Sequence, residues 1–118
     1  MGSIIFKRVA LVGKDIAQAR IYSPILMLFC RKGFGVVITG AGNFSEVLRF
    51  FEAQKPAFIF FHQDVKDKNP DAFDSLKRAL DALLPTAKIF EFKTGLELRV
   101  LVLEQTESLE APNGIKKS

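Results

Sequence analysis

The sequence predicts an α/β fold of three layers, in which helices cover both faces of a mostly parallel sheet. Over residues 36–64, strand-like apolar runs flank a helix-like amphipathic segment, which is the pattern of a right-handed strand–helix–strand unit. Residues 57–61 are all apolar, as expected for a strand that is buried on both faces. Together these observations favour a parallel sheet between two layers of helices.

The length and composition are those of one globular domain. A chain of 118 residues can bury most of its apolar surface, and its 48% hydrophobic and 25% charged residues exclude a disordered protein. No apolar run reaches the roughly 20 residues that span a bilayer, and no signal-peptide pattern follows Met1. We expect a cytoplasmic protein with one domain over residues 1–104 and a polar, flexible tail over residues 105–118.

The charged and sulfur-containing residues point to no nucleic-acid or metal site. The net charge of +4 is spread along the chain, and most of the twelve Phe are flanked by apolar residues rather than by Lys or Arg. This arrangement argues against a surface on which bases stack. The single cysteine, Cys30, lies in an apolar segment without a second thiol, so we expect it to pack in the core.

Three apolar segments in the first half of the chain predict the parallel strands. They are residues 4–12, 35–39 and 57–61. Between the first two, Ser23 and Pro24 form a typical helix start, and Gly33 is a stop. A helix is therefore predicted over residues 24–32, either alone or as the second part of a longer helix that is kinked at Pro24.

Two further helices are predicted from a capping residue that precedes apolar residues at helical spacing. The first begins at Asn43 or Ser45, and its buried stripe consists of Phe44, Val47, Leu48 and Phe51. The second begins at Asn69-Pro70 and continues up to Pro85. These helices would connect the second strand to the third and the third to the fourth.

The last part of the domain predicts a β-hairpin. Residues 87–93 and 96–103 are strand-like, and only Thr94-Gly95 lies between them, which is too short for a parallel crossover. We therefore expect a sheet of order 2-1-3-4-5 whose last strand is antiparallel. Charged residues interrupt both of these strands, so one face at this edge of the sheet should lack a covering helix. Leu98, Val100 and Val102 alternate with Glu97, Arg99 and Leu101, so the polar half of that face should meet water and the end around Leu101 and Leu103 should seek a partner.

Residues 43–62, NFSEVLRFFEAQKPAFIFFH, resemble the central part of a response-regulator receiver domain. In that family the second helix carries Gly-x-Glu-Ala-Leu and is followed by a Pro-Asp turn and an apolar strand. Glu46, Leu48, Pro56 and His62 match this spacing without a gap. The likeness extends more weakly over residues 8–92, and it implies a flavodoxin-like sheet and a role in signal transduction.

The residues that carry receiver chemistry are missing. The family phosphorylates an Asp where this chain has His62, and it holds Mg²⁺ with an acidic pair where Gly13 and Lys14, or Lys14 and Asp15, stand here. The family's Lys after the fifth strand is absent, and Thr94 only loosely replaces its switch Thr. The resemblance therefore implies a degenerate pocket that is not phosphorylated and holds no metal, formed by Gly13, Lys14, Asp15, His62, Asp64 and Thr94.

A receiver domain has a helix between its fourth and fifth strands and another at its C-terminus. This sequence has no room for either helix, so the resemblance is to a truncated receiver domain.

The pocket residues that follow the first and third strands have two interpretations. They form either an anion pocket or pH-sensitive contact, because His titrates near neutrality, or a solvated loop cluster in which Asp64 and Asp67 serve a turn. Both interpretations remain open from the sequence.

The functional prediction is a non-catalytic protein-interaction or homodimerisation module. The only His has no plausible Ser or Cys partner, so no nucleophile and base can be assembled and no enzyme activity or cofactor is expected. The interface would use the last two strands together with the apolar helix over residues 25–29. Its expected residues are Glu91, Lys93, Glu97, Arg99, Leu101 and Leu103.

A nucleotide-binding protein is the alternative. A strand followed by Gly40-Ala41-Gly42 and then a helix resembles a Rossmann phosphate-binding turn, with Gly40, Gly42 and Ser45 as phosphate-binding residues. However, Ser45 stands where the third Gly would be, and the chain is too short for a second mononucleotide half. A plain connection between strand and helix explains the same residues.

Overall fold

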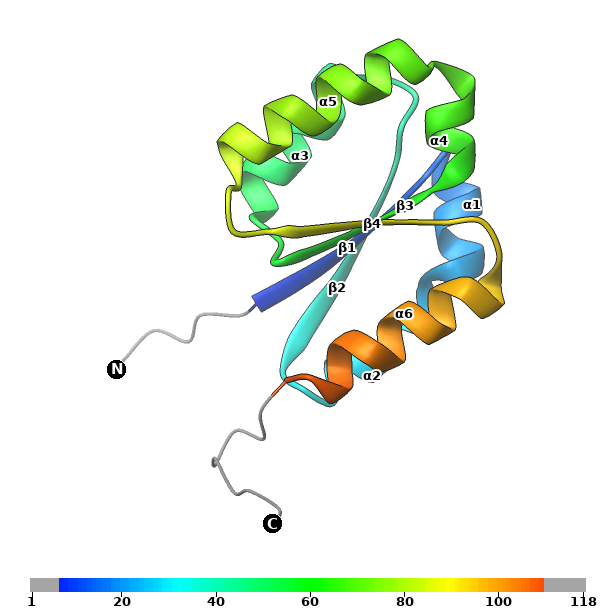
Figure 1. Ribbon diagram of the computed structural model, residues 1–118, viewed down its shortest axis with the longest axis vertical. Coiled ribbons are helices and arrows are strands. Elements are labelled where there is room, and N and C mark those ends of the chain that lie inside the picture. Colours follow the sequence, from blue (N-terminus) through cyan, green and yellow to red (C-terminus); the bar gives the residue numbers. More distant parts are fainter. Residues whose placement is uncertain (1–6, 110–118) are drawn as a thin grey trace.

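The computed structural model describes residues 7–109 and has the predicted three-layer α/β fold (Figure 1). Four parallel strands form one sheet with a flavodoxin-like layout, in the order β2-β1-β3-β4. Their bounds are β1 Lys7–Gly13, β2 Phe34–Gly40, β3 Phe58–His62 and β4 Lys88–Phe92. The first residues of the first predicted strand, 4–6, lie outside the described residues.

The helices form one layer on each face of the sheet (Figure 1). The lower layer in that view contains α1 Ile16–Tyr22, the 3₁₀ helix η1 Ser23–Leu26, α2 Met27–Cys30 and α6 Gly95–Glu107. The upper layer contains α3 Phe44–Gln54, α4 Gln63–Lys68 and α5 Pro70–Leu83. Within residues 7–109, no helix is both long and apolar enough to cross a bilayer.

The core has two halves because successive residues of a strand point to opposite faces of the sheet. Phe58 and Phe60 of β3 pack against the lower helices, where Phe29 of α2 is fully buried. Ile59 and Phe61 pack against the upper helices. The all-apolar strand that the sequence predicted thus supplies both halves of the core.

The predicted helix starts at Asn43 and Asn69 are confirmed. The Asn43 side chain accepts hydrogen bonds from the backbone N–H groups of Ser45 and Glu46, at 2.9 and 3.4 Å. The Asn69 side chain accepts one from the N–H of Ala72 at 3.1 Å, and Pro70 occupies the first turn of α5. Each cap satisfies an amide that has no partner within its helix.

The helical segment before β2 is longer and less regular than residues 24–32. It begins at Ile16, after Asp15 has capped the N–H of Gln18, and it changes to 3₁₀ geometry where Pro24 interrupts the α-helical hydrogen bonds. The alternative of a helix that is disturbed at Pro24 therefore describes it better than a single helix. Cys30 is exposed at the end of α2, so its predicted place in the core is wrong.

The predicted hairpin and antiparallel fifth strand are wrong. β4 pairs with β3 in parallel, and residues 96–103 belong to α6. Thr94 and Glu97 form a capping box, in which the Thr94 side chain accepts from the N–H of Glu97 and the Glu97 carboxylate accepts from the N–H of Thr94. This reciprocal cap starts a helix directly after β4.

The last part of the described chain corrects further expectations. The sheet has the order 2-1-3-4 rather than 2-1-3-4-5, a C-terminal helix is present, and this helix covers the face that was expected to be open. It also continues to Glu107, past the boundary expected at residue 104. Residues 63–68 form the short helix α4 instead of a plain turn.

Candidate functional site

The predicted pocket residues gather where the parallel strands end. Because β1, β3 and β4 run in the same direction, the segments that follow them meet at the carboxyl edge of the sheet. The last residues of the strands and the segments after them contain all the predicted members, which are Gly13, Lys14, Asp15, His62, Asp64 and Thr94. They also bring in Gln18 and Lys93, which the resemblance did not indicate.

Gln18 connects the segment after β1 to the segment after β3. Its Nε2 donates to Oδ2 of Asp64 at 2.8 Å, and its Oε1 accepts from the N–H of Lys14 at 2.7 Å. Its own N–H donates to Oδ1 of Asp15 at 2.8 Å. One amide side chain thus holds the two loops together across the crevice between β1 and β3.

The Asp64 carboxyl group has a pKa below its ordinary value. The hydrogen bond from Gln18 lowers its pKa most, and the nearby His62, Lys14 and Lys93 lower it further. Partial desolvation opposes these effects but does not cancel them. Asp64 is therefore a carboxylate at neutral pH.

His62 is a buried structural residue rather than part of a solvated loop. It is only 6% exposed, and its Nδ1 accepts from the N–H of Asp64 at 3.0 Å, which caps α4. The Asp64 carboxylate lies 3.7 Å from the same nitrogen. The ring packs against Tyr22 and Phe92, with centroid distances of 5.2 and 5.1 Å.

The carboxyl edge carries a shallow polar pocket of about 540 Å³. Its lining mixes both signs of charge and consists of Lys14, Asp15, Gly42, Asp64, Asp67 and Lys68. In the described part of the chain, no group of three or more His, Cys, Asp or Glu side chains could hold a metal ion.

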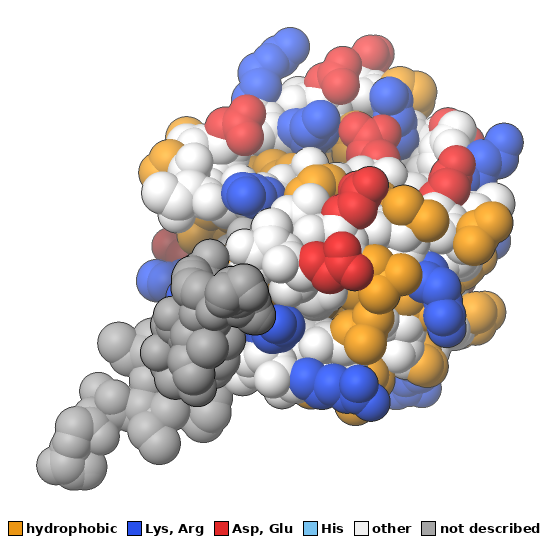
Figure 2. Space-filling view, turned by 60° about the horizontal axis from the view of Figure 1, so that its bottom comes forward, with side chains coloured by type: hydrophobic (Ala, Val, Ile, Leu, Met, Phe, Trp, Pro, Cys, Tyr) orange, Lys and Arg blue, Asp and Glu red, His pale blue; other side chains and the backbone are white. Residues whose placement is uncertain are grey.

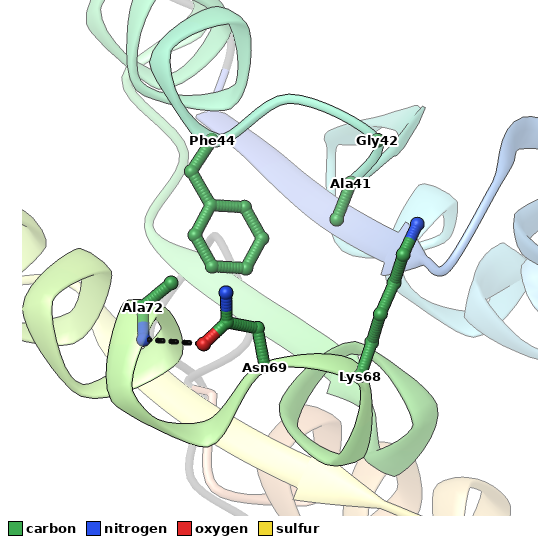
Figure 3. A pocket seen from close by; sticks show the side chains of 6 residues that line it. All are labelled: Ala41, Gly42, Phe44, Lys68, Asn69 and Ala72. Carbon is green, nitrogen blue, oxygen red and sulfur yellow. Dashed lines mark hydrogen bonds between the residues drawn. The ribbon is translucent and has the colours of Figure 1, made fainter.

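A second pocket, of about 310 Å³, lies beside the first, between the loop after β2 and the start of α5 (Figure 3). Phe44 and Asn69 face each other across it, and Lys68 stands at its side (Figure 3). The Asn69 carbonyl oxygen is engaged by the N–H of Ala72. The remaining lining is small and apolar, so Lys68 is the only charged side chain of this pocket.

The glycines of the predicted phosphate turn have different environments. A Cβ atom on Gly40 would lie 2.6 Å from the backbone nitrogen of Ile16 and 2.7 Å from backbone carbons of Asp15. A Cβ atom on Gly42 would meet nothing within 4 Å. Close packing of two loops therefore accounts for Gly40. The amides of Ser45 and Glu46 are already capped by Asn43, which leaves them unavailable to a phosphate.

The predicted interface residues lie on β4, on the loop after it and on α6, instead of on two strands. Glu91 of β4 pairs with Lys66 and Lys77, at 3.7 and 3.4 Å between charged atoms. Lys93, Glu97, Arg99 and Leu103 are exposed. Leu101 is half-buried against the lower core, so its expected exposure is not observed.

The outer face of α6 carries an apolar stripe, formed by Leu96, Val100 and Leu103. These residues follow each other at i, i+4 and i+7, which places them on one side of the helix. Their side chains are 72%, 46% and 39% exposed, while Leu98 and Val102 are fully buried on the opposite side. Figure 2 shows hydrophobic side chains gathered on the α6 and α2 face, with acidic side chains above them and basic ones beside and below.

A groove of about 350 Å³ runs beside this stripe, between α6 and the η1–α2 segment. Its lining is mostly apolar and consists of Pro24, Ile25, Met27, Leu28, Arg31, Arg99 and Leu103. Met27 is 56% exposed, and Ile21 on the preceding α1 is 69% exposed. Of the seven large hydrophobic side chains that are exposed among the described residues, six belong to α1, α2 and α6, and Leu83 of α5 is the seventh.

No protein-family model, no curated protein and no solved structure matches this chain significantly. Nothing about its function therefore follows from a relative.

Leu96 and Val100 were not among the predicted interface residues, and Gln18 was not among the predicted pocket residues. The capping-box pattern Thr94-x-x-Glu97 is a helix signal, and it would have placed Leu96 and Val100 on one helical face. Gln18 has no comparable signal. Its partner Asp64 is 46 residues away in the chain, and only the fold brings the two together.

Replacing Gln18 by leucine should raise the pKa of Asp64 toward its ordinary value, because the hydrogen bond that lowers it most is lost. A pH titration of the ¹³C carboxyl signal checks this. Gln63→Leu is the matched control, since Gln63 makes no hydrogen bond to Asp64. Equal Asp64 titration curves in wild type and Gln18→Leu would contradict the assignment.

The lowered pKa also gives the direction of a pH effect. A carboxyl group whose pKa is lower in the folded state stabilises the fold above its unfolded pKa, which is about 3.9 for Asp. This contribution is lost as the pH falls through the lowered value. In Gln18→Leu, acid should therefore remove less stability in this range than in the wild type.

Proposed function

We propose that this chain is a non-catalytic protein-interaction module, with the layout of a receiver domain that cannot be phosphorylated on Asp, and that it acts in a signalling assembly. The observation that carries the proposal is the apolar stripe of Leu96, Val100 and Leu103 on the outer face of α6. A helix that is apolar on both its inner and its outer side is typically packed against other protein on both sides.

The carboxyl edge supports a binding role without catalysis. Three polar side chains that could act on a ligand cap helices instead, namely Asp15, His62 and Thr94. Asp64 is held by Gln18. Lys14 and Lys68 line the polar pocket together with Asp67, and none of the residues that line it is a Ser, Cys or His, so no Ser–His or Cys–His pair can form there.

Nucleotide binding at the Gly40–Gly42 turn has weaker support. Gly40 is in backbone contact with the loop after β1, and the first free amides of α3 already have a side-chain cap. Glu46 adds a negative charge in the first turn of α3, where a phosphate would have to lie. We therefore favour the interaction module.

The test compares partner recovery by a variant of α6 and a matched surface variant. In cells that make the chain, cross-linking and mass spectrometry should recover a protein, or a differently tagged copy, with the wild-type chain. The double variant Leu96→Asp, Val100→Asp should recover it at least about tenfold less, because two charges would be buried in the interface.

Leu83→Asp is the control for this experiment. Leu83 is 38% exposed on α5, in the helical layer on the other side of the sheet. This variant should recover the partner at the wild-type level, and circular dichroism should show that both variants are folded. Undiminished recovery by the α6 variant would contradict the proposal.

A further inference from the structure

We propose that the partner of the α6 stripe is a second copy of this chain, and that the two α6 helices pack in parallel as a short two-stranded coiled coil. This inference rests on the proposed function and names its partner. It follows from the order of apolar and charged residues along the exposed side of α6.

The stripe has the spacing of a coiled-coil seam. Leu96, Val100 and Leu103 are separated by four and then three residues, which corresponds to positions d, a and d of a heptad. All three are exposed and available to a partner. The residue types also fit a dimer, because parallel pairs favour a β-branched residue at a and Leu at d.

The charges beside the stripe are complementary in the parallel arrangement. In this register Arg99 occupies position g, and Glu104 occupies the following position e. In a parallel coiled coil, position g of one helix faces the next position e of its partner. Arg99 of each copy would therefore pair with Glu104 of the other, which gives two ion pairs in the dimer. Within the described residues, Arg99 and Glu104 form no ion pair with each other or with another side chain.

Glu97, at the preceding position e, has a different role. Its carboxylate accepts hydrogen bonds from the N–H groups of Lys93 and Thr94, at 2.7 and 3.3 Å, and so caps α6. Of the two e positions, Glu104 is thus the one whose carboxylate is not engaged in this cap. In an antiparallel arrangement, the two Arg99 side chains would face each other on one side of the interface and the two Glu104 side chains on the other. Like charges would then repel on both sides.

The two-fold axis of this dimer runs along α6. The core lies on the opposite side of each helix, where Leu98 and Val102 are buried, so the two domains extend away from each other. A stripe of two helical turns is smaller than a standard protein interface. We expect a dissociation constant of about 10–100 μM.

Sedimentation equilibrium on charge variants of the full chain tests the pairing. Arg99→Glu and Glu104→Arg should each raise the dissociation constant about tenfold, because each places two like-charged pairs in the dimer. The combined variant should return to within about twofold of wild type, since it restores both pairs with reversed sign. Arg78→Glu, on the opposite helical layer, is the control for net charge and should have no effect.

Cysteine cross-linking tests the direction. In a Cys30→Ser background, Leu96→Cys and Leu103→Cys should each form a disulfide with the same position of the partner in a glutathione buffer. These positions are seven residues, or about 10.5 Å, apart along a helix, which is beyond the reach of a disulfide. Antiparallel helices would instead cross-link only when the two variants are mixed.

The outcomes separate this inference from the proposed function. A chain that stays monomeric at about 1 mM, a combined charge variant as weak as the single ones, or cross-links only in the mixture would each overturn the parallel homodimer. The proposed function is decided separately, by whether the Leu96→Asp, Val100→Asp variant loses its partner. If it does while the homodimer tests fail, the stripe binds a different protein.

Discussion

Phe29→Ala should lower the free energy of unfolding by about 4 kcal/mol, as expected for truncating a fully buried aromatic side chain. Phe29 is 0% exposed, and its ring centroid lies 5.3, 5.1 and 6.0 Å from those of Phe34, Phe58 and Phe60. The substitution leaves a cavity in the lower half of the core and removes these aromatic contacts. The side chain also fixes the short helix α2, which has few other buried residues.

Urea unfolding followed by circular dichroism measures this loss. Phe50→Ala is the matched control, because Phe50 is only half-buried on α3 and should lose about half as much or less. Phe29→Leu should recover part of the stability by filling some of the cavity. A loss below about 2 kcal/mol for Phe29→Ala would mean that the lower helices can collapse around the gap.

Gly40→Ala should destabilise the fold by about 3 kcal/mol, at the upper end of the effects of overpacking. The added Cβ would lie 2.6–2.7 Å from backbone atoms of Asp15 and Ile16. Backbone atoms cannot rotate away as a flexible side chain can, so the loop after β1 and the start of α1 would have to move. The Gln18 contacts depend on that loop and should weaken as well.

Gly42→Ala is the control for this variant, because its Cβ would point into open space. Thermal unfolding should give nearly the wild-type midpoint for Gly42→Ala and a midpoint lower by about 10 °C or more for Gly40→Ala. Equal midpoints would show that the loop after β1 moves freely. Gly40 would then be available for a ligand, as the phosphate-turn interpretation requires.

The central part of the fold could be predicted because several local signals agree there. The apolar residues 57–61 and the helix caps Asn43 and Asn69 all pointed to the observed elements. The C-terminal part could not be read from alternation alone. Leu98, Val100 and Val102 alternate like a strand, yet Leu98 and Val102 are also one helical turn apart and face the core together.

The candidate site was predictable in position but not in function. The ends of parallel strands converge in any such sheet, so the meeting of Asp15, His62 and Asp64 followed from the strand assignments. What each side chain does there depends on contacts that no local pattern encodes. His62 caps α4 and packs against two aromatic rings. Asp64 accepts a hydrogen bond from Gln18, which is 46 residues away in the sequence.

The two edge strands of the sheet differ in a way that affects aggregation. On β4, Lys88 and Glu91 are exposed, and Glu91 draws Lys66 and Lys77 toward that edge, which discourages another strand from pairing there. β2 has no charged residue, and within residues 7–109 it pairs only with β1. When heat loosens the molecule, intermolecular strand pairing should therefore begin at β2 and extend the sheet in one direction only.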